Sequence, residues 1–171
     1  VAYIGRLSSE KGLDDLLSAA AKTPDISYKI VGNGPEYIHL QAIAVDNGLK
    51  NVHFCGWQTG ENLVELYAGA RLLVVPSVWY ENCPLGILEA KSFGKIVLAS
   101  RIGGIPEMLD KRFLFPAGDS DALAELIKKW YNQPLSARQA IGDEFRTEVK
   151  RENNPEQYLL GLLSIYAGNN G

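Results

Sequence analysis

The sequence predicts an α/β protein with a doubly wound, Rossmann-like parallel sheet of about six strands. Short runs of Val, Ile and Leu recur along the chain, which is typical of strands that are buried on both faces. Each run is followed by a stretch with apolar residues at helical spacing, so strands and helices alternate. The runs at 1–5 and 71–76 are the least interrupted. We therefore expect them at the centre of the sheet.

Turn residues and apolar spacing define the individual elements. Leu13, Leu16 and Leu17 share one helical face, Gly48 is a typical C-terminal stop, and Asp121 favours the dipole of a helix that starts at 119. The expected strands are 1–5, 28–32, 52–56, 71–77, 96–100 and 113–115. The expected helices are 11–22, 36–48, 61–70, 85–93, 105–109 and 119–131, followed by two closing helices at 136–150 and 155–166.

The composition bounds the class of protein. The chain has 171 residues, 46% hydrophobic and 22% charged, which fits one globular domain or half of a two-domain enzyme. A net charge of −3 gives no indication that the chain binds nucleic acid or a membrane as a whole. We expect no nucleic-acid partner.

The cysteines and the lengths of the apolar runs bear on where the protein is located in the cell. The two cysteines predict free thiols in a reducing compartment, with one bridge between them left open. No apolar run reaches the roughly 18 residues of a membrane span, and no signal peptide is visible. We expect a cytoplasmic protein and leave open peripheral attachment to the inner membrane face. The chain begins inside a strand-like run, so we expect a piece of a longer parent.

Ligands of such sheets bind beyond the carboxyl ends of the strands, which directs attention to the loops there. The first loop, GRLSSEKG at 5–12, places Arg6 and Lys11 beside a helix N-terminus. Two cations at that position suit a diphosphate. Neither a Walker loop nor a G-x-G-x-x-G fingerprint is present. Two solvated surface cations remain an equal alternative.

The stretch WYENCPLGILEA at 79–90 carries two glutamates in a strand-to-helix turn. Pro84 suits the first helical position, and the amides that follow have no intrahelical partner and can meet a phosphate. Glu81 then lies near a sugar, and Glu89, deeper in the helix, suits the two hydroxyls of a ribose. The alternative is an acid that favours the helix dipole and a surface Glu89.

The sequence has no pattern of residues that is typical of a metal site. His39 and His53 are isolated, and no spacing links either of them to cysteines or paired acids. We expect no metal site and no cofactor.

Five motifs in register resemble one known family. They are G-R-L-x-x-E-K-G at 5–12, V-G-x-G-P at 31–35, V-x-F-x-G at 52–56, P-S-x-x-x-E-N-C-P-L-x-x-L-E-A at 76–90 and G-G-I-P-E at 103–107. Together they resemble the C-terminal, donor-binding half of the retaining "group 1" glycosyltransferases with two Rossmann-like domains. That family includes glycogen synthases, sucrose synthases and mannosyltransferases. The resemblance covers about 1–131.

The resemblance implies a UDP-, GDP- or ADP-sugar as donor, retention at the anomeric carbon and no requirement for a divalent metal. It assigns Arg6 and Lys11 to the leaving diphosphate and Glu81 to the transferred sugar, as the catalytic set. It implies that Glu89 binds the ribose and that the backbone near 56–58 meets the base. The donor-binding set is Gly5, Gly56, Trp57, Gln58, Asn82, Cys83, Pro84, Leu85 and Glu89.

The resemblance also shapes the domain assignment. Residues 1–171 are expected to form the nucleotide-sugar-binding domain, with 135–171 as closing helices. The N-terminal domain, which binds a carbohydrate, lipid or other acceptor, is absent, so the chain alone is expected to be inactive. An apolar stripe on the last helix predicts partial exposure or self-association. The stripe comprises Tyr158, Leu159, Leu162, Leu163 and Tyr166.

Some features depart from the family pattern, and two other functions stay open. The motif has Asn-Cys-Pro at 82–84 where many members have Gly-Phe-Gly. Lys91 and Ile96 replace the usual Met and Pro, and we interpret both replacements as structural. The alternative functions are a nucleotide-sugar epimerase of related architecture and a non-catalytic module that binds sugar nucleotides.

Overall fold

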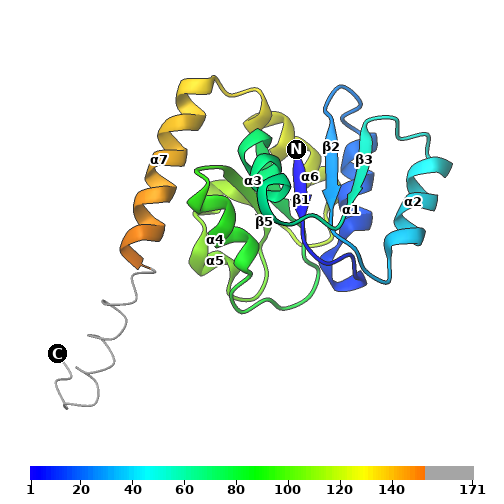
Figure 1. Cartoon of the computed structure of the whole chain (residues 1–171), viewed down its shortest axis with the longest axis horizontal. Coiled ribbons are helices and arrows are strands. Elements are labelled where there is room, and N and C mark those ends of the chain that lie inside the picture. Colours follow the sequence, from blue (N-terminus) through cyan, green and yellow to red (C-terminus); the bar gives the residue numbers. More distant parts are fainter. Residues whose placement is uncertain (153–171) are drawn as a thin grey trace, which may run out of the picture.

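The computed structural model describes residues 1–152, in which a six-stranded parallel sheet has helices on both faces (Figure 1). The order of the strands across the sheet is β3-β2-β1-β4-β5-β6. The strands are β1 (Ala2–Ile4), β2 (Tyr28–Val31), β3 (Val52–Gly56), β4 (Leu72–Val75), β5 (Ile96–Ser100) and β6 (Leu114–Phe115). The predicted fold class is therefore confirmed. The last expected helix and its apolar stripe lie outside the described residues.

The order of the strands reverses between β1 and β4: successive strands are added on one side of β1 up to β3, and then on the other side from β4 onward. Ala2 of β1 pairs with Lys29 of β2 on one side and with Leu73 of β4 on the other. The first three strands run outward from β1, and the last three run outward from β4 in the opposite direction. The predicted central position of these two strands is confirmed. The loops that follow them meet at the switch point, where ligands bind in such sheets.

Helices cover the sheet in two layers. They are α1 (Leu13–Ala21), α2 (Tyr37–Asp46), α3 (Gly60–Gly69), α4 (Leu85–Ser92), α5 (Ile105–Met108), α6 (Ser120–Tyr131) and α7 (Leu135–Glu152). In one layer α1 packs against α2 and α6, and in the other α4 packs against α7. Figure 1 shows α3 and α4 in front of the strands, with α1 and α6 behind them. No helix among residues 1–152 is long and apolar enough to cross a membrane.

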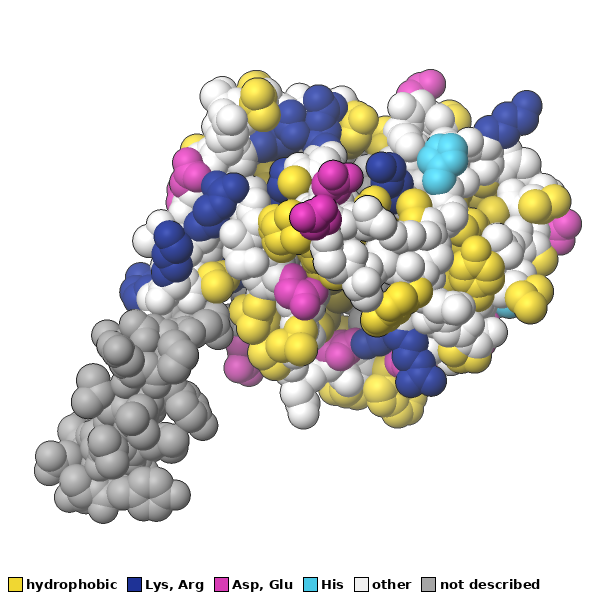
Figure 2. All heavy atoms as spheres, in the orientation of Figure 1, with side chains coloured by type: hydrophobic (Ala, Val, Ile, Leu, Met, Phe, Trp, Pro, Cys, Tyr) yellow, Lys and Arg dark blue, Asp and Glu magenta, His cyan; other side chains and the backbone are white. Residues whose placement is uncertain are grey.

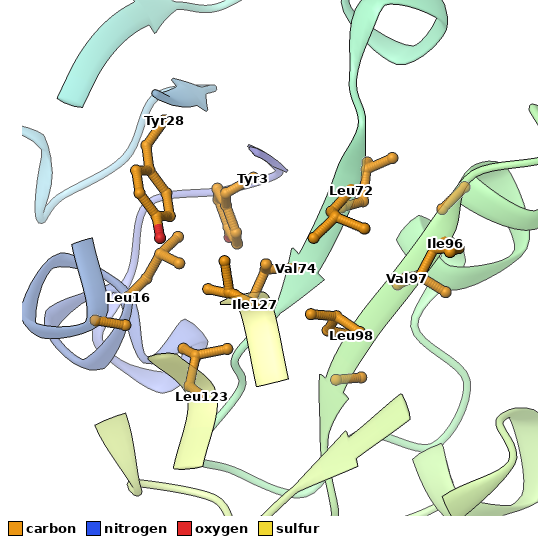
Figure 3. Packing of buried hydrophobic residues seen from close by; sticks show 14 of the residues in the cluster. Tyr3, Leu16, Tyr28, Leu72, Val74, Ile96, Val97, Leu98, Leu123 and Ile127 are labelled. Carbon is orange, nitrogen blue, oxygen red and sulfur yellow. The ribbon is translucent and has the colours of Figure 1, made fainter. Parts of the chain in front are cut away.

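The core explains why the strands read as continuous apolar runs. All five residues of β5 are buried, because α6 and α4 both contact it. Figure 3 shows Leu123 and Ile127 of α6 meeting Leu16 of α1 and Val74 of β4. These four side chains are at most 1% exposed. Side chains on both faces of the central strands are thus removed from water, which is the main stabilising contribution.

Several element boundaries differ from the sequence-based prediction by one or more residues, and three of these differences concern the loops and helix ends. Lys11 does not begin a helix, because Ser9–Lys11 form a 3-10 turn and Gly12, at φ 64°, separates them from α1. The expected edge strand is preceded by a second 3-10 turn (Lys111–Phe113) and starts only at Leu114. Pro84 is the N-cap of α4 rather than its first helical residue.

Candidate functional site

The loop after β1 is fixed by its backbone and leaves one cation exposed. The Leu7 amide donates to Asn33 O at 3.0 Å, and the Leu7 side chain is fully buried. The Tyr3 hydroxyl donates to Arg6 O at 2.6 Å. Burial, followed by the charges of Glu81 and Glu10, raises the pKa of Tyr3, so this donor stays protonated. The side chain of Arg6 consequently projects into solvent from an anchored backbone.

The same loop ends in a direct contact with the loop after β4. Lys11 Nζ lies 2.5 Å from Glu81 Oε1, and Ser77 Oγ donates to the same oxygen at 3.0 Å. The two charged side chains are 27% and 19% exposed, so the ion pair is only partly screened by water. Both of these bonds end on Oε1 rather than on Oε2 of the carboxylate. Two of the three predicted catalytic residues, Lys11 and Glu81, are thereby brought together.

A pair of glycines after β5 supports the backbone of this acid. The Gly104 amide donates to Glu81 O at 2.8 Å. A Cβ atom at Gly103, where φ is 57°, would lie 2.4 Å from Glu81 O, and one at Gly104 would lie 2.2 Å from Asn82 O. Contacts this short are not tolerated. The sequence pattern at 103–104 indicates only a strand-to-helix turn, whereas in the structure these glycines also allow the two loops to touch.

The N-terminus of α4 follows directly. Pro84, at φ −67° and ψ 112°, ends the loop, and the eight-residue helix begins at Leu85. The Ile87 amide donates to Pro84 O at 3.0 Å, which leaves the amides of Leu85 and Gly86 at the helix terminus, where negative charge is favoured. Asn82, Cys83 and the side chain of Leu85 are exposed around this terminus. The arrangement suits an anion held by backbone amides.

Glu89 lies one turn into α4 and is oriented by a residue that the sequence analysis missed. The Tyr67 hydroxyl donates to Glu89 Oε2 at 2.5 Å. Glu89 is exposed, whereas Tyr67 is 2% exposed and stacks on Phe93 with ring centroids 4.7 Å apart. Burial and the bond to Glu89 raise the pKa of Tyr67 and keep the hydroxyl protonated. Glu89 is therefore a surface acid with one oxygen fixed from inside the protein.

The residues expected at the base lie farther along the same edge. Gly56 adopts φ 65° at the end of β3, and its carbonyl accepts from the Gly32 amide at 2.8 Å. Gln58 Nε2 donates to Cys55 O at 2.7 Å, and Trp57 is 70% exposed. Two strand spacings, roughly 10 Å, separate β3 from β1. The predicted residues therefore form a row along the edge, rather than one compact cluster.

A large hollow at the opposite edge has a different character. It measures about 500 Å³ and is lined by Arg71, Lys95, Arg138 and Arg146, at the amino ends of β4 and β5. Figure 2 shows a group of Lys and Arg side chains at the upper edge of the molecule, near the beginning of α7.

These cations have a structural explanation. Lys95 Nζ donates to Ala68 O of α3, Arg71 to Tyr131 O of α6, and Arg146 to Phe93 O after α4. Helix C-termini carry partial negative charge, which these side chains neutralise. We therefore place the candidate site at the carboxyl edge and not in the hollow at the amino edge.

Possible metal ligands and the two cysteine thiols are the other reactive groups to consider. No group of three or more His, Cys, Asp or Glu side chains within residues 1–152 could hold a metal ion. Cys55 and Cys83 are free, so the disulfide that the sequence left open does not form.

Two polar contacts of the site went unpredicted for different reasons. Ser77 is part of the P-S motif at 76–77 and could have been identified from its position four residues before Glu81. Tyr67 carries no such local signal, because it lies 22 residues from Glu89 and on another helix.

A family model and the curated relatives of this chain both point to one family. A family model described as "Glycosyl transferases group 1" matches residues 1–147. The sulfoquinovosyl transferase SQD2 of Arabidopsis thaliana is 32% identical over 158 residues, covering 88% of this chain and 30% of that protein. The chain thus spans about a third of the length of the curated relatives it matches, with shares of 30–34% for the first three.

Solved structures agree with the sequence comparison. Sucrose-phosphate synthase of Thermosynechococcus elongatus superposes with a TM-score of 0.85 at 28% identity, covering 98% of this chain and 44% of that chain. HepE of Anabaena, in complex with UDP, gives a TM-score of 0.85 at 25% identity, covering 95% and 48%.

Proposed function

The chain belongs to the group 1 glycosyltransferases, and from this membership we propose that it binds the donor, a nucleoside-diphosphate sugar, at the carboxyl edge of its sheet. The observation that carries the proposal is the contact between Lys11 and Glu81, which joins the loops after the two central strands. In a longer protein that also binds an acceptor, this domain supports transfer of the sugar. We propose that the residues described here bind the donor, and that transfer also needs the parts of such a protein that bind the acceptor, since the chain covers 30–34% of the length of its first three curated relatives.

Each charged residue has a separate role in the proposal. Arg6 and Lys11 neutralise the diphosphate, with Arg6 reaching it from the exposed side of the anchored loop and Lys11 from beside Glu81. The first amides of α4 hold phosphate oxygens. Glu81 lies beside the transferred sugar, and its Oε2 accepts from a sugar hydroxyl. Glu89 accepts from the ribose hydroxyls.

We propose a reaction that the family membership favours and that this placement can support. The bond between C1 of the sugar and the diphosphate oxygen breaks, and its electron pair stays on that oxygen. The acceptor hydroxyl forms the new bond on the same face of the sugar and passes its proton to the departing phosphate, so the configuration is retained. Arg6, Lys11 and the helix terminus stabilise the charge that develops on the diphosphate, which lowers the barrier without a metal ion.

The base is proposed to be uracil, since the structural relative HepE is in complex with UDP. The test is a thermal-shift titration of the chain with UDP, GDP and ADP. A nucleotide that binds the native state raises its melting temperature by mass action. We expect UDP to give the largest shift and the other two smaller shifts.

Arg6→Ala is the sharper variant for the phosphate contact, because Lys11→Ala would also leave Glu81 without its ion pair. Arg6→Ala should weaken UDP binding by about 1–3 kcal/mol, the scale of a charged hydrogen bond, and less at high salt. Lys50→Ala, at an exposed site before β3, is the matched control. The proposal fails if no nucleoside diphosphate shifts the melting temperature, or if both variants bind UDP like the parent.

Sugar transfer itself is tested on the full-length protein with radiolabelled donor. Incorporation of label into an acceptor supports transfer. A non-catalytic module would bind donor without incorporation, and an epimerase would change the donor sugar in the absence of acceptor.

A further inference from the structure

We propose that Tyr67 is a positioning residue that orients Glu89 toward the ribose of the donor; this inference rests on the proposed function. Tyr67 is too deeply buried to touch a ligand, so it acts only through the carboxylate that it contacts. Nothing in the motif pattern at 76–90 includes it, because it belongs to the preceding helix, α3.

The two oxygens of the Glu89 carboxylate are available to different partners. A phenol has one proton to donate, and Tyr67 gives it to Oε2 at 2.5 Å. Oε1 then keeps its acceptor sites for an outside donor such as a ribose hydroxyl. Without this bond, an exposed glutamate on a helix samples several rotamers, and binding must select one of them. Tyr67 removes that cost in advance, which is preorganisation.

The phenol that donates this bond is itself held rigidly. The Tyr67 ring stacks on Phe93 with an interplanar angle of 5°, and its single rotatable hydroxyl bond leaves little freedom once the ring is packed. Phe93 follows the last residue of α4, so the stack connects the end of that helix to α3. The position of Glu89 is thereby tied to the helix that connects β3, near the expected base, to β4, near the expected sugar.

The hydroxyl of Tyr67 is not needed for packing. A phenylalanine would make the same stack, whereas a buried hydroxyl costs free energy unless it is bonded. The partner that satisfies it is a site acid on the surface rather than a backbone carbonyl of the core. Tyr28 provides the contrast, because its buried hydroxyl lies 2.6 Å from Thr23 Oγ1, away from the carboxyl edge.

The experiment is calorimetric titration of the full chain with two ligands, UDP and its 2′,3′-dideoxy analogue. Tyr67→Phe keeps the ring stack and removes only the hydroxyl. We expect it to weaken UDP binding about three- to tenfold, the scale of one hydrogen bond, and to change binding of the dideoxy analogue less than about twofold. A merely structural hydroxyl would not make the loss depend on the ribose hydroxyls.

Tyr28→Phe is the matched control, since it also deletes one buried phenol bond. It should lower the melting temperature by a comparable amount and leave the affinity for UDP unchanged. A second measurement uses the Glu89→Gln background, in which adding Tyr67→Phe should cause no further loss of UDP affinity.

The outcomes separate this inference from the function on which it rests. If the parent chain binds no UDP, the proposed function fails and this inference with it. If the parent binds UDP and Tyr67→Phe weakens both ligands equally, or neither, Tyr67 does not position Glu89 while the proposed function stands. A larger loss for UDP than for the dideoxy analogue, absent in Tyr28→Phe, supports the inference.

Discussion

Glu81 and Glu89 lie only eight positions apart, yet their surroundings differ in kind. Glu81 is recessed and already shares one oxygen with Lys11 and Ser77. Glu89 is exposed and has its inner oxygen fixed by Tyr67. The position of Glu81, beside a cation and near the N-terminus of α4, suits contact with a reacting sugar. The exposed and oriented Glu89 suits contact with a ribose. The structure therefore gives a reason to expect different phenotypes from the same substitution at the two positions.

We predict that Glu89→Gln weakens binding of bare UDP and raises the Michaelis constant for donor in the full-length protein. The ribose contact is present in both ground and transition states, so its loss should leave turnover nearly intact. Glu81→Gln should leave UDP affinity within about twofold and lower turnover by about tenfold or more. Titrations of the chain with UDP and donor kinetics on the full-length protein measure both effects.

A shared phenotype would contradict this division. If both variants lost UDP affinity equally, or neither did, the two acids would be better interpreted as features that cap and orient α4.

Lys91 shows what a single departure from the family pattern can mean. The side chain is buried, and its Nζ donates to Met108 O at 2.8 Å and pairs with Glu148 Oε1 at 2.7 Å. These contacts agree with the predicted structural role, since they join α4 to the end of α5 and to α7. The sequence could not show the partners, because Glu148 is 57 positions away.

At the scale of elements, the site depends on loops that touch through backbone atoms. The loop after β5 reaches the loop after β4 only because Gly103 and Gly104 have no side chains. The loop after β1 meets the end of β4 at Gly12, where a Cβ atom would lie 2.1 Å from Pro76 O. Three loops are therefore fixed against one another before any ligand binds.

Gly104→Ala tests this support. Alanine is compatible with φ −82°, so the backbone angle is not strained, but its Cβ would collide with Asn82 O. We predict a loss of about 1–3 kcal/mol in the free energy of unfolding, the scale of an overpacked contact, measured by urea denaturation. We also predict weaker binding of both UDP and UDP-glucose, with the larger loss for UDP-glucose, because the displaced loop carries Glu81 and leads into α4.

Gly69→Ala is the control, because a Cβ atom there meets nothing within 4 Å. It should be neutral or slightly stabilising. Equal stability of both variants, with equal affinity for UDP-glucose, would show that the loops are not held by this contact.

Sequence reasoning located nearly every element because local patterns determine them. The run Leu72–Val75 is buried and apolar, and Asp119 caps α6 by accepting from the Ala122 amide at 2.9 Å. What it could not supply were contacts between distant segments, such as Tyr67 with Glu89, or the break at Gly12. That break depends on how closely the backbone approaches Pro76, which no local pattern reports.

At the scale of the whole molecule, the two edges of the sheet differ chemically. The carboxyl edge carries the paired Lys11 and Glu81, the exposed Arg6 and the start of α4. The amino edge carries helix C-termini that Arg71, Lys95 and Arg146 neutralise. Cations at either edge attract an anionic nucleotide, so the location of binding is the central claim to test.

The most direct test is amide NMR of the labelled chain during titration with UDP. We predict chemical-shift changes at the carboxyl edge, in the loops at 5–12, 56–60 and 77–85 and at Glu89. We predict none beyond noise around Arg71, Lys95 and Arg138, which line the hollow at the opposite edge. Changes centred on that hollow, with the carboxyl-edge loops unperturbed, would contradict the account.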